Sequence, residues 1–266
     1  MKIKKFFLTL IRPILLWSDR NELYHGWPMA FFLIAYCIIF HIIEVIPRSH
    51  YLTIVMPIDR VIPFCELFVV PYLSWFVFVT IGIIKCYRLD RDAYDELCTS
   101  LMIGMGLFLV ISAFLPNRQP LRLLEMPRDN VFTWLVTQLW KMDTPTNVWP
   151  SIHVFNTAAV EMAILKSGHP TFRKLSFRIG LSIWSLLIIL STVFIKQHSM
   201  FDMITAFILI AICYIRIYRE HAVWRFAKWD AFALRIEKEA REAEQLRLKR
   251  LRKLRKQKRR KKKKWA

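Results

Sequence analysis

Residues 97–115 read LCTSLMIGMGLFLVISAFL, a stretch without a single charged side chain. A membrane-spanning helix needs about 20 predominantly apolar residues, so this stretch is long enough to cross a bilayer. The rest of the chain has a similar character, because 55% of its 266 residues are hydrophobic and its mean hydropathy is positive. These values argue against a soluble domain with one core and predict an all-helical, polytopic membrane protein.

Six stretches are apolar enough, or nearly enough, to be membrane spans. The fourth is short and carries Glu161, but omitting it would leave its two flanking loops on incompatible sides of the membrane. We therefore predict a bundle of six transmembrane helices. The spans cover approximately Pro28–Ile46, Val61–Ile84, Leu97–Leu115, Ser151–Leu165, Phe177–Ile195 and Met200–Tyr218.

Composition divides the chain into an N-terminal segment (1–27), a membrane catalytic domain (28–228) and a basic tail (229–266). The N-terminal segment is expected to lie in the membrane interface, because Arg12 and Pro13 interrupt its apolar stretch and no signal-peptide cleavage site follows. The last 32 residues carry 17 Lys and Arg against four Glu. We expect this tail to bind anionic lipid headgroups, with a nucleic acid as the weaker alternative.

The distribution of basic residues between the loops predicts the orientation. Basic residues favour the cytoplasmic side. In a six-span protein the second loop, the fourth loop and both termini face the same way, and each of these segments carries Lys or Arg residues. The chain is therefore expected in the cell membrane with both termini in the cytoplasm. The third loop, Pro116–Trp149, then lies outside although it contains four basic residues, which suggests that they have a function there.

Two histidines lie where predicted spans meet polar loops. His153 follows Pro150 and Ser151, a helix-start signal in which Ser151 is the expected N-cap. Unpaired backbone amides and the helix dipole make such an end suited to bind a phosphate. His198 stands four residues before Asp202, on the same helical face, where the carboxylate can orient the imidazole. Both histidines fall on one side of the membrane, so we predict a single extracytoplasmic site.

These motifs resemble the signatures of the type 2 phosphatidic acid phosphatase superfamily, which includes lipid phosphatases and the sphingomyelin and inositol phosphorylceramide synthases. The middle signature, Pro-Ser-x-His, ends here at His153, and the last one, Ser-(x)6-His-(x)3-Asp, corresponds to Ser191, His198 and Asp202. The resemblance covers roughly residues 116–206. It implies that His198 is the nucleophile that takes the phosphoryl group, that Asp202 orients it, and that His153 protonates the leaving oxygen.

The side chains that would bind phosphate follow the family pattern less closely. The resemblance implies that Ser151 and Arg122 hold phosphate oxygens. The first signature, Lys-(x)6-Arg-Pro, is incomplete around Arg122, and the arginine that follows the serine of the last signature is replaced by Thr192. Arg118 or Lys196 is expected to supply the missing charge. These departures resemble the synthase branch, so transfer to an alcohol stays open beside hydrolysis.

Other polar residues have simpler explanations. The five cysteines lack metal or redox spacing and are expected to be packing residues. Glu161 is expected to pair with Lys166 or Arg173, and Asp129 and Asp143 are expected to be solvated. Because no carboxylate cluster has metal-ligand spacing, we expect no metal and no other cofactor.

The sequence thus predicts a metal-independent lipid phosphatase or phosphotransferase that cleaves a phosphoester or pyrophosphate bond through a phosphohistidine. A transporter would instead place its polar residues near the membrane midplane and often shows internal repeats, which this chain lacks. A non-enzymatic anchor that presents the basic tail to a polyanion would account for the tail but not for His198 and Asp202. Deletion of the tail separates these alternatives, because an enzyme would still release phosphate.

Overall fold

The computed structural model describes residues 23–220, residue 223 and, in the tail, residues 235, 238, 239, 241, 242 and 245. The expected interfacial segment and almost all of the basic tail lie outside these residues. The structure contains 74% helix and 2% strand, which confirms the all-helical class. Contacts divide the chain into two compact units: Met29–Trp224, which contains the bundle and the histidines, and a second unit of Met1–Pro28 with Arg225–Ala266.

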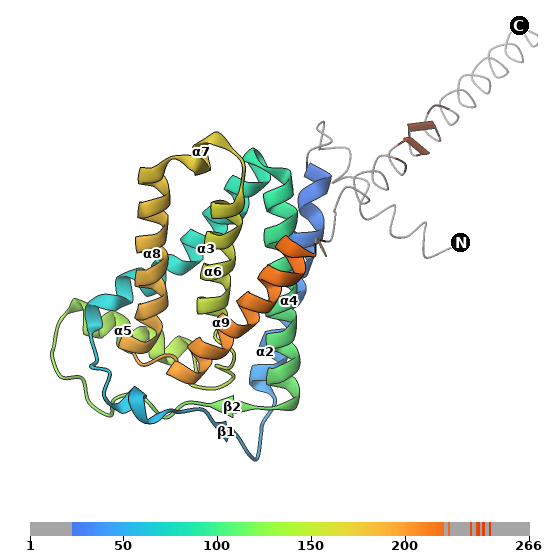
Figure 1. Cartoon of the computed structure of the whole chain (residues 1–266). Helices are drawn as coiled ribbons and strands as arrows, with labels where there is room; N and C mark the ends of the chain where they lie inside the picture. Colours follow the sequence, from blue (N-terminus) through green and yellow to red (C-terminus); the bar gives the residue numbers. More distant parts are fainter. Residues whose placement is uncertain are drawn as a thin grey trace, which may run out of the picture. The chain divides into compact units, whose positions relative to one another are not determined.

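Six helices form the bundle (Figure 1). Five helical segments of the described residues are long and apolar enough to cross a membrane, which fits a membrane protein. The sixth, α6, has only 15 residues. The bundle helices are α2 (Trp27–Val45), α3 (Val69–Leu89), α4 (Arg91–Phe114), α6 (Ile152–Lys166), α8 (Leu175–Phe194) and α9 (Met200–Tyr214), the last continued by the π-helical turn η4 (Ile215–Arg219).

The short helix α6 lies inside the bundle and packs against α3, α4, α8 and α9 (Figure 1). Its residues 153–157 are all buried, so consecutive positions around the helix face protein rather than lipid. Two glycines make this packing possible. A Cβ atom at Gly104 would lie 2.0 Å from Phe155, and one at Gly82 would lie 2.4 Å from Val160. Small residues at such contacts let membrane helices approach closely.

The five longer helices expose apolar side chains around this centre. Phe76, Ile183 and Phe114 are examples, with exposed fractions of 59%, 55% and 80%. A continuous apolar surface of this extent is expected where helices contact lipid. The five cysteines are all free; Cys86, Cys98 and Cys213 are buried, Cys65 is half-buried and Cys37 is exposed.

The bundle helices alternate in direction, so three helix starts and three helix ends meet at one end of the bundle. The starts of α3, α6 and α9 lie there with the ends of α2, α4 and α8 (Figure 1). We call this the site end. The single-residue turn at Asp90 and the short helix α7 (Pro170–Arg173) lie at the other end, which we call the opposite end. Asp90 caps α4 by accepting a hydrogen bond from the amide of Ala93, 3.1 Å away.

The connections at the site end are folded segments. A parallel pair of short strands, β1 (Leu52–Thr53) and β2 (Asn117–Arg118), joins the loops after α2 and α4. Two short 3-10 helices, η2 (Pro57–Arg60) and η3 (Glu66–Phe68), precede α3, and η1 (Leu23–Gly26) precedes α2. The segment expected as a plain loop contains the helix α5 (Val131–Met142), capped by Asn130. Val136 of α5 is fully buried against Val69 and Tyr72 of α3.

Candidate phosphate-handling site

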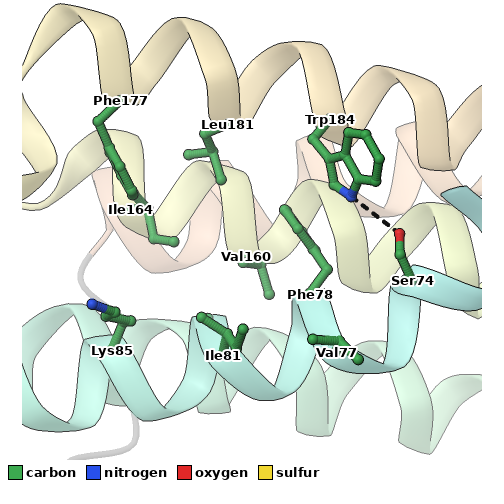
Figure 2. Close-up of a pocket in the computed structure, with 11 residues that line it drawn as sticks. Ser74, Val77, Phe78, Ile81, Lys85, Val160, Ile164, Phe177, Leu181 and Trp184 are labelled. Atoms are coloured by element: carbon green, nitrogen blue, oxygen red, sulfur yellow. Dashed lines mark hydrogen bonds between the residues drawn. The ribbon is translucent and has the colours of Figure 1, made fainter.

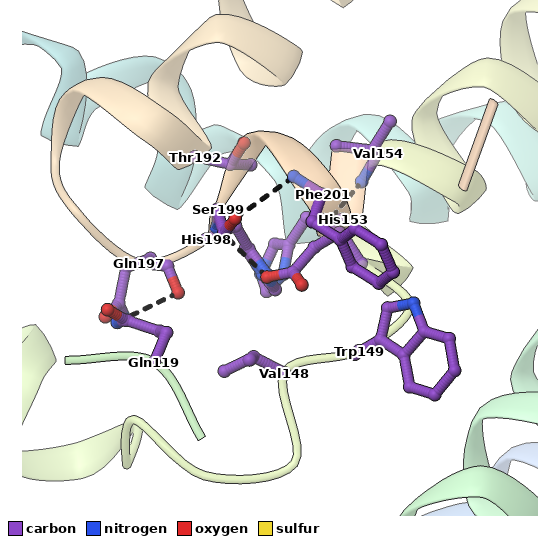
Figure 3. A network of polar contacts seen from close by, with 12 residues as sticks. Gln119, Val148, Trp149, His153, Val154, Thr192, Gln197, His198, Ser199 and Phe201 are labelled. Atoms are coloured by element: carbon purple, nitrogen blue, oxygen red, sulfur yellow. Dashed lines mark hydrogen bonds and ion pairs between the residues drawn. The ribbon is translucent and has the colours of Figure 1, made fainter. Parts of the chain in front are cut away.

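The two histidines and Asp202 meet in one buried cluster at the site end. The Nδ1 atom of His198 lies 3.3 Å from the Oδ2 atom of Asp202, and its Nε2 atom lies 3.4 Å from the Nδ1 atom of His153. All three side chains are at most 8% exposed. Figure 3 shows both imidazoles beside the starts of α6 and α9. With a proton on its Nδ1 atom directed at the carboxylate, His198 presents its Nε2 lone pair as an acceptor to the Nδ1 atom of His153.

The turn between α8 and α9 fixes the position of His198. The backbone amides of Gln197 and His198 both donate to the carbonyl oxygen of Thr192, at 3.0 and 2.9 Å. Lys196 adopts a left-handed conformation with φ of 57°, which reverses the chain after α8. Ser199 then begins α9 as its N-cap and accepts a hydrogen bond from the amide of Phe201. The imidazole is therefore held by a rigid corner between two helices.

Ser151 connects the start of α6 to the same corner. As expected from the sequence, it is the N-cap of α6, and its hydroxyl accepts from the amide of Val154 at 3.4 Å. Its own amide donates to the carbonyl oxygen of Asp202 at 3.5 Å. Ser151 is fully buried. The two sequence motifs are thus linked through the backbone as well as through their imidazoles.

Arg122 lies close to this corner in a network of its own. Its guanidinium donates to the side-chain oxygen of Gln197 at 2.6 Å, to the carbonyl oxygen of Trp140 at 2.7 Å, and to the carbonyl oxygen of Asp143. It also lies 5.6 Å from the centre of the Trp140 ring. Burial lowers the pKa of Arg122, while the nearby Asp143 opposes this effect. The guanidinium remains a cation, because arginine does not deprotonate in proteins.

The other two expected phosphate ligands lie differently. The ammonium group of Lys196 donates to the carbonyl oxygens of Asp59 and Ile62 at 2.9 and 2.5 Å, so it points into the loop after α2. Burial lowers the pKa of Lys196, and Asp59 opposes this. Arg118 is exposed on β2, where its backbone bridges to Thr146. Within residues 23–220 its guanidinium has no hydrogen-bond partner.

Two aromatic rings of α3 lie against His153, and neither contact was expected from the sequence. The ring of Tyr72 stacks on the imidazole with centroids 4.6 Å apart, and the ring of Trp75 lies at 4.3 Å. Tyr72 and Trp75 are separated by three positions and therefore share one helical face. In the sequence they are two aromatic residues of an apolar span, where aromatic residues are common.

Asp143 belongs to the same network, and the expectation that it is solvated is wrong. Its Oδ2 atom accepts from the hydroxyl of Tyr72 at 3.0 Å and from the side-chain Nε2 atom of Gln197 at 2.8 Å. Burial raises the pKa of Asp143, while nearby His198 opposes the rise. Asp143 is half-buried because α5, which was not expected, carries it back onto α3.

Asp59 is a buried carboxylate that the sequence did not indicate. It lies on η2 and is 2% exposed. Its carboxylate accepts from the hydroxyl of Ser199 at 2.7 Å, from the amide of Met200 at 2.7 Å and from the amide of Met56 at 2.6 Å. Asp59 therefore fastens the start of α9, which carries Asp202 and directly follows His198, to the loop after α2. Pro57 at the start of η2 is a signal that could have marked this helix start, but no local pattern records the contact of Asp59 with Ser199.

Side-chain amides complete the base of the site end. Gln119 donates to the carbonyl oxygens of Lys196 and Gln197 at 2.9 and 3.3 Å (Figure 3). Asn117 accepts from the amides of Val148 and Trp149 at 2.9 and 3.0 Å. The start of the third loop is thus bonded both to the α8–α9 corner and to the end of the same loop, just before α6.

Glu161 does not take the expected partner. It accepts a hydrogen bond from the hydroxyl of Ser182 on α8 at 2.5 Å, so the prediction of a pair with Lys166 or Arg173 is wrong. The amine of Lys166 instead donates to the hydroxyl of Tyr214 at 2.9 Å. Glu161 lies two helical turns from His153 and faces away from the cluster toward α8. Its hydrogen bond joins α6 to α8.

In the part of the chain that the structure describes, no group of three or more His, Cys, Asp or Glu side chains is arranged to hold a metal ion. The chain matches no protein-family model, no curated protein and no solved structure.

Proposed function

We propose that the protein is an integral membrane phosphatase or phosphotransferase that cleaves a phosphoester or pyrophosphate bond of a lipid through a phosphohistidine. One observation carries this proposal. His198 contacts a carboxylate through one ring nitrogen and a second imidazole through the other. A nucleophile oriented by an acid group and adjacent to a proton donor is the arrangement that group transfer requires. Membership of the type 2 phosphatidic acid phosphatase superfamily is part of the same proposal.

The first half-reaction breaks the bond between phosphorus and the leaving oxygen. The Nε2 atom of His198 attacks phosphorus in line, and His153 gives a proton to the departing oxygen. Asp202 stabilises the imidazolium character that develops on His198. In the free protein the facing nitrogens of the two rings are 3.4 Å apart. A phosphoryl group must therefore enter between the imidazoles, and their contact is the resting state of the site.

The second half-reaction transfers the phosphoryl group to water or to an alcohol. His153, now without its proton, accepts the proton of the attacking hydroxyl. The new phosphorus–oxygen bond forms as the phosphorus–nitrogen bond breaks, and the electron pair of that bond returns to His198. Microscopic reversibility makes the acid of the first step the base of the second. No external oxidant or reductant is involved.

Charge on the phosphoryl oxygens needs cationic and amide donors. Arg122 is the leading candidate, because its guanidinium already contacts Gln197, the residue next to His198. The first turn of α6, with Ser151 at its cap, offers backbone amides and the positive end of the helix dipole. Lys196 and Arg118 would have to leave the positions described above to contribute.

The proposal includes six membrane spans with the site on the extracytoplasmic side and both termini in the cytoplasm. The helix α6 counts as the sixth span because it is enclosed by longer helices and needs no lipid-facing length of its own. The orientation follows from basic residues at the opposite end, among them Lys85, Arg88, Lys174 and Arg219. The basic tail would then bind anionic headgroups of the cytoplasmic leaflet.

Phosphate release by the purified protein tests this function. Phosphatidate, an isoprenyl pyrophosphate and phosphatidylglycerophosphate serve as substrates, each with and without an alcohol acceptor. We expect release or transfer from at least one of them in the presence of a strong chelator, and none with His198→Gln. Retained activity in His198→Gln, or activity that depends on added magnesium or zinc, would contradict the proposal.

A further inference from the structure

A long apolar groove runs along the membrane-embedded part of the bundle, away from the histidines. It lies between α3 and α8, with α6 as its floor, and encloses about 290 Å³ (Figure 2). Ile81 and Leu181 form its two walls, and Val160 lies on its floor. At one end the indole of Trp184 donates a hydrogen bond to the hydroxyl of Ser74 at 3.0 Å and spans the groove.

The other end of the groove is cationic. Lys85, on the last turns of α3, lines it there and is exposed. Lys174 is the exposed N-cap of α8 and stands three residues before the lining residue Phe177, so it lies at the same end of the groove as Lys85. Within residues 23–220 neither lysine has an ion-pair partner, and Asp90 is already bonded to Ser167 and Ala93. The two cations are thus available to a ligand.

The length of the groove matches one leaflet of a bilayer. From Ser74 to Lys85 the helix α3 advances 11 residues, which is about 16 Å at the rise of an α-helix. One leaflet contributes about 15 Å to the hydrocarbon thickness. A lipid chain that starts at Lys85 would therefore end close to Trp184, at the closed end. Apolar walls over the length of one leaflet, with cations only at the interface, complement an anionic headgroup attached to an acyl chain.

We propose that this groove binds an anionic phospholipid from the leaflet at the opposite end of the bundle, with its phosphate at Lys85 and Lys174 and one acyl chain between α3 and α8. The site is separate from the histidine cluster, and the proposal does not depend on the proposed enzymatic function. It requires only that the bundle is embedded in a membrane. A zwitterionic lipid would fill the same walls but would gain little from the two lysines.

Photochemical labelling in lipid vesicles tests the proposal with the full-length protein. The probe is phosphatidylglycerol with a photoreactive group in its acyl chain, and phosphatidylcholine with the same chain is the matched control. Labelled positions on α3, α6 and α8 are measured by peptide mass spectrometry after illumination. We expect the groove residues to be labelled by the anionic probe several-fold more than by the zwitterionic one.

Variants separate the contribution of the headgroup from that of the chain. A basic residue near an anionic membrane surface contributes about 1 kcal/mol, so Lys85→Ala should lower labelling by the anionic probe about fivefold, and Lys85→Ala with Lys174→Ala about 25-fold. Lys141→Ala, which removes an exposed cation at the site end, should have no effect. Leu181→Trp should fill the groove and abolish labelling by both probes, whereas Ile183→Trp, on the outer face of α8, should not.

Three outcomes would overturn the proposal. Equal labelling by the two probes in the unmodified protein would show that the groove contacts membrane lipid without a preference for an anionic headgroup. Unchanged labelling in the double variant Lys85→Ala with Lys174→Ala would show that the headgroup does not bind at these lysines. Labelling that is lost in Arg122→Ala but kept in Lys85→Ala would assign the groove to a chain whose phosphate lies at the histidines. All variants keep the basic tail, so its general attraction for anionic lipid is the same in each.

Discussion

Replacing Asp59 with asparagine should destabilise the site end and slow the reaction, although Asp59 touches neither histidine. One carboxylate oxygen accepts from Met56 and Ser199, and the other accepts from the amide of Met200. An asparagine has one oxygen and one NH2 group, so whichever way it turns, a backbone amide loses its acceptor. A hydrogen bond to a charged group contributes about 1.5–3 kcal/mol, and we expect a loss of about that size in the free energy of unfolding.

The same substitution should lower kcat, because Asp59 holds the first turn of α9 and with it His198. A displacement of about 1 Å at a reacting group can reduce the rate about 10²-fold. Unfolding by SDS titration from mild-detergent micelles and steady-state phosphate release measure the two effects. Asp129→Asn, in an exposed part of the same end, is the control and should change the unfolding free energy by less than about 0.5 kcal/mol. If Asp59→Asn matched this control in both measurements, the fastening role of Asp59 would be refuted.

The other predictions concern the cluster and the membrane orientation. His153→Gln should slow cleavage of an alkyl phosphoester by about 10²-fold to 10⁴-fold, the usual contribution of general acid catalysis. An aryl phosphate should still form the phosphoenzyme in an acid-quench assay of this variant. An equal loss of rate with both substrates would contradict the role of His153. Asp202→Asn should leave folding intact and lower kcat far more than it changes KM, because it favours the wrong tautomer of the neighbouring imidazole. Burial raises the pKa of Asp143, so the free energy of unfolding should fall as the pH rises from the ordinary aspartate range through the raised pKa. In a pH series of unfolding curves, Asp143→Asn should remove that fall. An unchanged dependence of the unfolding free energy on pH in this variant would contradict the prediction. In a background without the native cysteines, a cysteine at position 130 should react with an impermeant reagent from outside and one at position 167 only after permeabilisation; the reverse pattern would place the site in the cytoplasm.

The helices were predictable because membrane spans are encoded in local composition. The expected spans overlap all six bundle helices, and the end of α8 at Phe194 lies one residue from the expected position. The start of α4 was missed by six residues, because charged residues between Arg91 and Glu96 hid a helix that Asp90 caps. The helix α5 was missed because it is short and is stabilised by contacts with α3 that no local pattern records.

The cluster was predictable in part, for reasons of spacing. Ser151 marks the start of one helix and Asp202 lies in the first turn of another, so these two helix starts alone bring the groups to one end. The sequence placed His198 and Asp202 on one helical face, but His198 lies in the turn just before the N-cap of α9. The partners of Lys196 and Asp143 depend on loops folding across 54 to 137 positions of sequence. Composition carries no information on such contacts. The aromatic rings beside His153 were hidden for a related reason, since any apolar span contains such residues.

The most direct test of the central claim is detection of the phosphohistidine itself. A labelled lipid phosphate is mixed with purified protein, the reaction is quenched within a turnover, and acid-labile phosphate is mapped by mass spectrometry. We predict label on His198 in the unmodified protein, more of it in His153→Gln with an aryl phosphate, and none in His198→Gln. Label on another residue, or turnover without a phosphoenzyme in any variant, would contradict the account.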